Sequence, residues 1–379
     1  MLKSLSIKNF RSIEDLNISK LGDINLIVGK NNSGKSTVLD ALKTYASFAD
    51  ENVLFDILNS HDEYFILDEN DQNLSPFSNL FFGRKFRSDL KIEIAESKDR
   101  DALTIESAFV EEVRIEESES LFRLAYNDIK TEEDFNDAQD VLRALKIKQG
   151  NKEKTIVLDI DRLRRRRNRR GTSSSKFNFK FITTSFIANE ELADAWDKVA
   201  LRDYSKEVLK ALQIIEPKIE AISFIDSETF ESSYRSSIRQ DIRRIPLVRL
   251  HGLDIPVPLK SMGDGIIRLF QLALRLFEAK GGLLFIDEFE NGLHYSVQEE
   301  AWKVIFHLSK ELDIQIFCTT HSWDCIESFS KVATQEKDIE GLLFRLGSSS
   351  VGDNEGKTTV TIFDEDDLEI LTQSQVEVR

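Results

Sequence analysis

The sequence predicts an α/β fold in which a mainly parallel core is interrupted by an inserted antiparallel segment. Three observations support this prediction. The apolar run INLIV leads through glycines into the helical pattern VLDALKTYA, short β-like runs dominate residues 50–150, and helix and strand alternate again from Ser261 onward. We therefore divide the chain into a first core part at 1–48, an insertion or second lobe at 49–250 with strands, helices and an arginine-rich loop, and a second core part at 251–379.

The composition fits a soluble protein with one large core and an insertion, or with two lobes. The chain has 379 residues, of which 41% are hydrophobic. Its formal net charge of −16 argues against a surface that coats nucleic acid as a whole, although a local basic patch is compatible with it. No run approaches the ~18 apolar residues of a membrane span, and Cys318 and Cys325 lack the spacing of disulfides or zinc ligands. We expect a cytoplasmic protein without a membrane partner.

The first and middle parts of the chain differ in pattern. Strands are expected at Leu2–Asn9 and Ile24–Val28, followed by a glycine loop and a helix from Lys35 into Thr44. The middle predicts an acidic amphipathic helix from Thr131 to about Ile147. It further predicts strands at LKIEIAE, ALTIESAFVEEV, SLFRLAY, TIVLDID, FNFKFITTSF and IEAISFI, helices at EELADAWDKVAL and SKEVLKALQIIEP, and a hairpin over RIPLVRLHGLDIPVPL. No sustained heptads occur, so long coiled-coil arms are not expected.

The glycine loop has the composition of a phosphate-binding loop. Gly29-x4-Gly34-Lys35-Ser36 stands between a predicted strand and a predicted helix, which is the context that this pattern requires. Backbone N–H groups would point inward, Lys35 would reach the β- and γ-phosphates of ATP, and Ser36 would offer its hydroxyl to Mg²⁺. A structural turn would not need Lys35 and Ser36 at these positions. The residues expected to bind the nucleotide in this loop are Gly29, Asn31, Asn32, Ser33, Gly34, Lys35, Ser36 and Thr37.

Two later strands end in residues that suit such a site. The apolar run from Gly282 to Ile286 leads into Asp287 and Glu288, which would hold Mg²⁺ and act as general base, respectively. Taken alone, the two acids would more simply be the solvated end of a strand. The strand from Ile314 to Thr320 is followed by His321, which we interpret as a sensor of the γ-phosphate because ligands bind at the carboxyl ends of such strands. A structural histidine is the alternative.

The segment KSMGDGIIRLFQLALRL predicts a helix whose start can bind an anion. Free N–H groups at a helix start favour negative charge, and the residues there are Ser261, Gly263, Asp264 and Gly265. An ordinary helix start, with Ser261 or Asp264 as the N-cap residue, is the alternative.

The order of these motifs resembles the ABC-type ATPases of the SMC, RecF and OLD (overcoming lysogenization defect) branch. The similarity is greatest to the stand-alone ATPases of bacterial anti-phage modules such as PARIS and Septu. It covers about the first fifty and the last hundred and thirty residues, and IKNFRSI, DEFENGLH and TTHSWDCI are the pieces typical of this branch. The resemblance implies an ABC-type ATPase head with a mixed sheet.

The resemblance also implies a role for each motif. Gly29–Thr37 would be the Walker A loop, Asp287 with Glu288 the Walker B pair, Ser261–Gly265 the signature, Asn291–His294 the D-loop, and His321 the switch histidine. ATP with Mg²⁺ would lie between two protomers, so a homodimer or a higher homo-oligomer is implied. The signature SMGDG departs from the more general LSGGQ, and Gln72 is a weak candidate for the glutamine of the Q-loop.

The resemblance sets expectations for partners as well. Only 58 residues follow His321, too few for the Toprim nuclease domain of OLD proteins, so a nuclease or toxin is expected to be a separate chain. The arginine run could neutralise DNA phosphates, or be a solvated loop, or dock on an acidic surface of this chain or of a partner. Its residues are Arg162, Arg164, Arg165, Arg166, Arg167, Arg169 and Arg170.

Three functions remain open at the level of the sequence. The first is an Mg²⁺-dependent ATPase that acts as the sensor or regulatory subunit of a repair-like or defence module. The second is a scaffold that ATP locks around an effector, with little turnover. The third, an ATPase subunit of a transporter, is disfavoured by SMGDG, by NFRSI and by the weak Q-loop.

Overall fold

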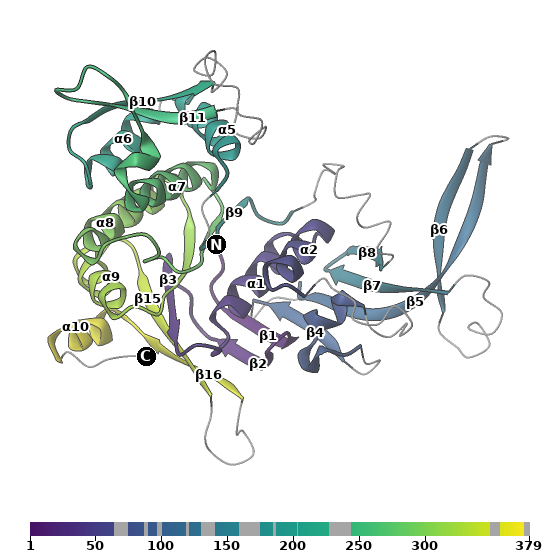
Figure 1. Cartoon of the computed structure of the whole chain (residues 1–379). Coiled ribbons are helices and arrows are strands. Elements are labelled where there is room, and N and C mark those ends of the chain that lie inside the picture. The colour runs from purple at the N-terminus through teal and green to yellow at the C-terminus, as the bar shows by residue number, and fades with distance from the viewer. Residues whose placement is uncertain are drawn as a thin grey trace.

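The part of the chain that the computed structural model describes forms three sheets. The described residues are 1–63, 75–86, 90–96, 101–118, 121–129, 141–158, 175–184, 187–202, 204–226, 244–348 and 357–374. A six-stranded core sheet lies beside an antiparallel seven-stranded sheet, and a small three-stranded sheet covers one end of the core (Figure 1). The predicted α/β class with an inserted antiparallel segment is confirmed.

The core sheet is parallel except at one edge. Its order is β16-β15-β3-β14-β13-β9, and only β16 runs antiparallel to its neighbour. The strands are β3 (Ile24–Gly29), β9 (Phe179–Ile182), β13 (Leu283–Ile286), β14 (Gln315–Thr319), β15 (Gly341–Ser348) and β16 (Thr358–Phe363). The helices on one side of this sheet are α7 (Asp264–Glu278), α8 (Tyr295–Leu312) and α9 (Trp323–Gln335), and α10 (Glu365–Ser374) packs beside α9.

The central strand β3 is buried on both faces. Ile24, Leu26 and Val28 pack into the cluster formed by α7, α8 and α9. Ile27 packs into the second cluster, which contains α1 (Lys35–Ala46) and the first strands of the antiparallel sheet. This explains why INLIV reads as a continuous apolar run, as buried parallel strands do. Helix α1 thus lies between the two large sheets.

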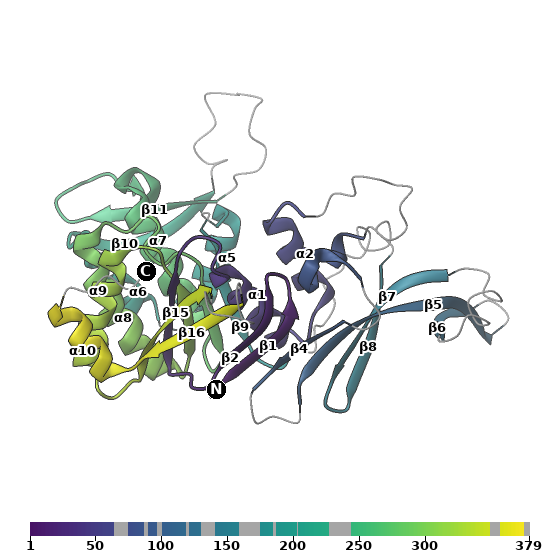
Figure 2. The same cartoon turned by 90° about the horizontal axis from the view of Figure 1, so that it is seen from below.

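The seven-stranded sheet has the order β2-β1-β4-β5-β7-β8, with β6 paired to β5. The hairpin of β5 and β6 extends away from the rest of the molecule (Figures 1 and 2). Strand β2 at the other end of the sheet lies beside β16 of the core sheet (Figure 2). The strands are β1 (Leu5–Phe10), β2 (Ile13–Ile18), β4 (Lys91–Ala95), β5 (Leu103–Ser118), β6 (Leu121–Ile129), β7 (Val141–Gln149) and β8 (Lys152–Val157).

The third sheet packs near the start of α7. Its strands β10 (Ile219–Asp226), β11 (Arg244–Leu250) and β12 (Val257–Pro258) confirm the predicted hairpin. Helices α5 (Asn189–Ala200) and α6 (Ser205–Gln213) lie between this sheet and α7. Helix α2 (Glu51–Ser60) packs against α1. In the part of the chain that the structure describes, no helix is long and apolar enough to cross a membrane.

One prediction for the middle of the chain was wrong. We expected a helix from Thr131 to Ile147, but residues 141–147 belong to β7, and 131–140 lie outside the described residues. Strand β7 pairs with β5 and β8, so its backbone groups are satisfied between strands. Leu145 and Ile147 are buried whereas Lys148 is exposed, and this alternation in LKIK is the strand pattern that the acidic residues before it obscured.

The three sheets do not coincide with the three parts into which the sequence was divided. Strands β1 and β2, from the first part, lie in the antiparallel sheet, and β9, from the middle part, lies at the edge of the core sheet. The division at 48 and 250 stays a prediction. Gln72 and the arginine run between 162 and 170 lie outside the described residues.

Candidate nucleotide site

The phosphate-loop segment begins at Gly29, the last residue of β3, and runs into the first turn of α1, which starts at Lys35. Gly34 has φ 97° and precedes Lys35, and Asn32 also has a positive φ of 64°. A Cβ atom on Gly29 would lie 2.6 Å from both the Leu346 carbonyl oxygen and Ser33 Oγ, so only glycine fits there. The loop therefore turns tightly and presents the free N–H groups of the α1 N-terminus.

The amino group of Lys35 lies over this loop. Lys35 Nζ donates to the carbonyl oxygens of Gly29 (2.8 Å) and Lys30 (3.1 Å). Burial lowers the pKa of Lys35, and the negative charges of Asp287, Glu288 and Glu290 oppose that shift. Because those charges act on Lys35, the structure brings the phosphate loop and the acid pair into one site.

The acid pair follows β13 at the carboxyl end of the core sheet, held by a hydroxyl of the neighbouring strand. Thr319 Oγ1 donates to Asp287 Oδ1 (2.6 Å) and accepts from the backbone N–H of Glu288 (2.9 Å). Glu288 has φ 48°, in the left-handed region, which costs an ordinary residue ~1–3 kcal/mol. Its side chain is 42% exposed, so the carboxylate can reach a ligand.

Ser36 and Asp287 are the residues in this site that could hold a metal ion. One hydroxyl and one carboxylate are hard oxygen donors, which fits Mg²⁺, an ion that keeps several waters and phosphate oxygens as further ligands. In the described residues, no group of three His, Cys, Asp or Glu could form a protein-only metal site. The donor set thus suits a metal that arrives with a nucleotide.

Arg268 joins the signature helix to the acid pair. From the second turn of α7, its guanidinium donates to the carbonyl oxygens of Thr183 (2.7 Å), Asp287 (3.0 Å) and Glu288 (2.9 Å). Only 1% of the residue is exposed, and burial lowers its pKa to about 10. Arg268 was not predicted from the sequence, although a lone cation in the apolar stretch GIIRLF needs buried acceptors and could have signalled it.

Glu290 is a second supporting residue that was not predicted from the sequence. Its Oε1 lies 3.1 Å from His321 Nδ1 and accepts from the His321 backbone N–H (3.0 Å), while its Oε2 accepts from Thr320 Oγ1 (2.7 Å). The Glu290 side chain is only 10% exposed, whereas His321 is 56% exposed. Glu290 therefore fixes the position of the histidine. Glu290 is the third acid in DEFE, and a third acid so close to the predicted acid pair could have signalled a role in the site.

The signature segment begins α7 without a side-chain cap. The helix starts at Asp264 after Gly263, which has φ 100°, and no side chain caps this start, so the alternative with Ser261 or Asp264 as N-cap is wrong. Ser261 Oγ instead donates to the Pro258 carbonyl oxygen (2.7 Å). Ser261, Gly263 and Asp264 are exposed, which leaves the first N–H groups of α7 open to an anion.

The D-loop segment packs against this helix start. A Cβ atom on Gly265 would lie 3.1 Å from the Gly292 carbonyl oxygen, so the two backbones are in close contact. Asn291 Nδ2 donates to the Thr184 carbonyl oxygen (2.6 Å), and His294 caps α8 through the Ser296 N–H. Among the described residues, no hydrogen bond or ion pair joins the signature to the phosphate loop of the same chain.

A cavity of about 340 Å³ lies beside α1, at the junction with the antiparallel sheet. Ser12 Oγ and Thr37 Oγ1 are 3.0 Å apart at its wall. Arg11, which has φ 53°, binds Glu63 at 2.8 Å. The cavity thus adjoins the phosphate loop at Thr37, where the remainder of a nucleotide could extend.

The strand order specifies the class of the protein. The strand with the phosphate loop, β3, is separated from the strand with the acid pair, β13, by β14 alone, and His321 follows that intervening strand. Phosphate loop, acid pair and histidine therefore lie along one edge of a parallel sheet. With the uncapped signature helix, this arrangement defines a P-loop ATPase with an ABC-type head.

The comparison with protein families agrees with this class. The chain belongs to the AAA ATPase domain family, whose model matches residues 1–326, and the protein is an ATPase. It is 23% identical over 365 residues to the ATP/GTP phosphatase of Helicobacter pylori, covering 89% of this chain and 90% of that protein. It is 46% identical over 55 residues, 14% of this chain and 25% of that protein, to an uncharacterized protein of Methanocaldococcus jannaschii.

Solved structures similar in fold are heads of SMC proteins. The SMC head domain from Thermotoga maritima is 14% identical, with coverage of 96% of this chain and 99% of that chain and a TM-score of 0.42. An SmcHead bound to the C-winged helix domain of ScpA is 12% identical, with coverage of 96% and 98% and a TM-score of 0.48.

Proposed function

We propose that this ATPase hydrolyses ATP with Mg²⁺ in composite sites shared by two protomers. Lys35 and the α1 N-terminus bind the phosphates, Ser36 and Asp287 hold Mg²⁺, and Glu288 polarises the attacking water. His321, positioned by Glu290, contacts the γ-phosphate. The H. pylori relative, described as an ATP/GTP phosphatase, supports hydrolysis of nucleotide by this site.

The observation that carries the two-protomer proposal is the open signature helix. Its first N–H groups are exposed at Gly263 and Asp264, and no contact among the described residues links them to the phosphate loop of the same chain. An exposed helix N-terminus that lacks a cap favours an anion. The γ-phosphate of an ATP held by a second protomer would supply that anion, and ATP would then join two chains.

The biological role that we propose is that of a sensor or regulatory subunit of a defence or repair-like module, acting with a separate nuclease or toxin. The motif resemblance to the OLD branch supports this role. Co-purification of the native protein with its partners tests this role. DNA binding by the arginine run stays a prediction, and DNA that co-purifies with the native protein would support it. A pull-down that yields a membrane permease would contradict the proposal.

Complementation between two inactive variants tests the composite site. Lys35→Ala removes the mobile cation at the phosphates and should abolish ATP binding. Ser261→Arg blocks the signature face but leaves Lys35 and Ser36 intact, so each chain should bind ATP without hydrolysing it. After mixing, about a quarter of wild-type activity should return, because half of the dimers are heterodimers with one of two sites intact.

Two results would refute the proposal. Normal hydrolysis by Ser261→Arg alone would show that one chain suffices, and wild-type ATP affinity of Lys35→Ala would remove the phosphate-loop assignment. Phosphate release that stops after one turnover in the wild-type protein would instead favour the ATP-locked scaffold.

A further inference from the structure

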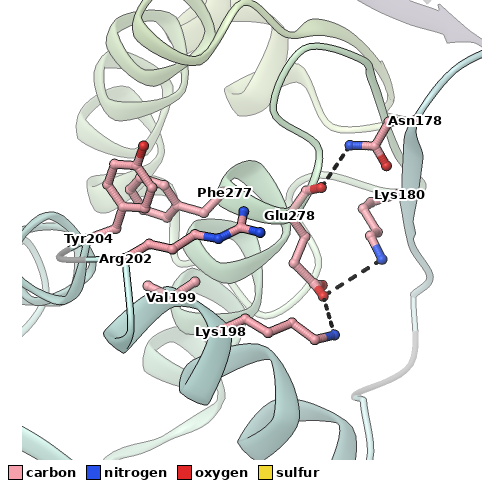
Figure 3. Close-up of a pocket in the computed structure, with 8 residues that line it drawn as sticks. All are labelled: Asn178, Lys180, Lys198, Val199, Arg202, Tyr204, Phe277 and Glu278. Atoms are coloured by element: carbon pink, nitrogen blue, oxygen red, sulfur yellow. Dashed lines mark hydrogen bonds and ion pairs between the residues drawn. The ribbon is translucent and has the colours of Figure 1, made fainter.

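A second pocket has a volume of about 200 Å³, and Figure 3 shows the side chains that line it. It is formed where β9 begins, where α7 ends and where α5 runs into the segment before α6. The pocket therefore lies near the amino ends of β9 and β13, which are parallel. The acid pair of the nucleotide site follows the carboxyl end of β13, at the opposite edge of the sheet. The lining residues are Asn178, Lys180, Lys198, Val199, Arg202, Tyr204, Phe277 and Glu278.

One buried carboxylate positions the cations of this pocket. Glu278, whose side chain is 7% exposed, lies 3.2 Å from Lys198 Nζ and 3.7 Å from Lys180 Nζ, and it also accepts from Arg275. Burial would raise the pKa of Glu278, but Arg275 and Lys180 outweigh burial and hold it below the usual range. One negative charge therefore faces three positive charges.

Arg202 adds a further cation to the same space. Its guanidinium points into the pocket toward Glu278 and Lys198 (Figure 3). Within the described part of the chain, no hydrogen bond or ion pair involves its side chain. Glu191 pairs with Arg275, so the charge of Glu278 faces both Lys180 and Lys198, and Arg202 adds a third cation to the pocket. A local excess of positive charge in a chain of net charge −16 requires an explanation.

The opposite wall of the pocket is apolar. The rings of Tyr204 and Phe277 stack with centroids 4.5 Å apart at 18°, and Val199 lies beside them. Asn178 Nδ2 donates to the carbonyl oxygens of Glu278 (2.9 Å) and Lys280 (3.2 Å), which fixes the end of α7 at the rim. A volume below the ~300–1,000 Å³ of drug-sized sites limits the ligand to a small one.

We propose that this pocket binds a phosphate monoester carried by a small organic group. The planar guanidinium of Arg202 and the ammonium groups of Lys180 and Lys198 are the donors that bind phosphate best. Glu278 positions both lysines before the ligand arrives, and the ring of Tyr204, with Phe277 and Val199 buried behind it, contacts the organic group. The chemistry fits a free sugar phosphate and the 5′-phosphate of a nucleic-acid strand alike. The site is separate from the ATP site and does not rest on the composite-site proposal.

Calorimetric titration of the full chain tests this proposal. The probes are ribose 5-phosphate, a 5′-phosphorylated dinucleotide and the same dinucleotide without phosphate. Lys198→Ala and Arg202→Ala should each weaken binding of a phosphorylated probe at least ~10-fold, since each removes a charge-assisted hydrogen bond. Both residues are exposed, so the variants should keep their fold. Lys218→Ala, an exposed lysine outside the lining, is the matched control for charge.

The outcomes distinguish the two sources of the phosphate, and they distinguish binding in this pocket from binding in the nucleotide site. Tighter binding of the phosphorylated dinucleotide assigns a nucleic-acid end, and binding of ribose 5-phosphate alone assigns a free metabolite. Lys35→Ala should leave either affinity unchanged. The proposal is overturned if no phosphorylated probe saturates the protein, if the unphosphorylated dinucleotide binds equally well, or if Lys35→Ala weakens binding as strongly as Arg202→Ala.

Discussion

Replacing Arg268 by Met should weaken both the folded state and hydrolysis. The guanidinium donates to three backbone carbonyl oxygens, of Thr183, Asp287 and Glu288. Hydrogen bonds from a charged group contribute ~1.5–3 kcal/mol each, hence roughly 4.5–9 kcal/mol for three. Burial of the charge, which lowers the pKa of Arg268 from its usual value to about 10, costs about 3 kcal/mol. The expected net loss in the free energy of unfolding is therefore roughly 2–6 kcal/mol, because Met keeps most of the packing.

Urea unfolding at pH 7 without nucleotide measures that loss, and steady-state phosphate release measures the second effect. Arg268 holds the carbonyl of Glu288, a residue with φ 48°, so its removal should let the carboxylate shift and lower kcat ~10–100-fold. Gln271→Met is the matched control, one turn along α7. Gln271 is fully buried and its side-chain amide has no partner among the described residues, so the control should be neutral or stabilising.

Two results would refute this reasoning about Arg268. A loss in the free energy of unfolding below ~1 kcal/mol would show that the three hydrogen bonds merely offset the cost of burying the charge. An unchanged kcat in a destabilised variant would show that the conformation of Glu288 does not depend on α7.

Two further predictions concern carboxylates that hold a histidine. Glu290→Gln should lower kcat at least ~10-fold with little change in ATP affinity, because the single amide oxygen cannot accept both from His321, as Oε1 does, and from Thr320 Oγ1, as Oε2 does; a variant as active as the wild type would contradict the positioning role. Burial alone would raise the pKa of Asp40, but the hydrogen bond from His61 and the charge of Lys43 hold it below the usual range. Asp40 thus stabilises the fold above its unfolded pKa, ~3.9, and the effect is lost as the pH falls through the lower folded value. Asp40→Asn should cost about 3 kcal/mol at pH 7, and its difference in stability from the wild type should begin to shrink as the pH falls below ~4; a constant difference would contradict this assignment.

The parallel core was predictable because its strands and helices carry strong local signals. INLIV and GLLFI are continuous apolar runs followed by glycine or acid, and the helix after SMGDG has a clear apolar face. Strand β7 was not predictable in the same way, because besides β8, which follows it directly, it is stabilised by pairing with β5, which lies much earlier in the chain. Its first half, VLRA, has no alternation that distinguishes a strand from a helix.

The candidate site was predictable where residue type and spacing determine the chemistry. Lys35, Asp287, Glu288 and His321 come together at one sheet edge, and their catalytic roles stay predictions. Arg268 and the other supporting residues were not predictable, because they act on backbone carbonyls or neighbouring side chains that only the folded chain brings within reach.

The position of β3 at the centre of the core sheet bears on how the chain folds during synthesis. Ile24 pairs with Ile316 on one side and with Gly341 on the other, and Leu2 bonds to Gln315. At ~5–20 residues per second, a ribosome needs roughly 15–60 s to supply those partners. All strands of the antiparallel sheet are translated before residue 158, so that sheet can form while both edges of β3 are still unpaired. We expect the apolar segment INLIVG to be the part of the nascent chain most exposed to aggregation, and the phosphate loop to be among the last parts to reach its final form.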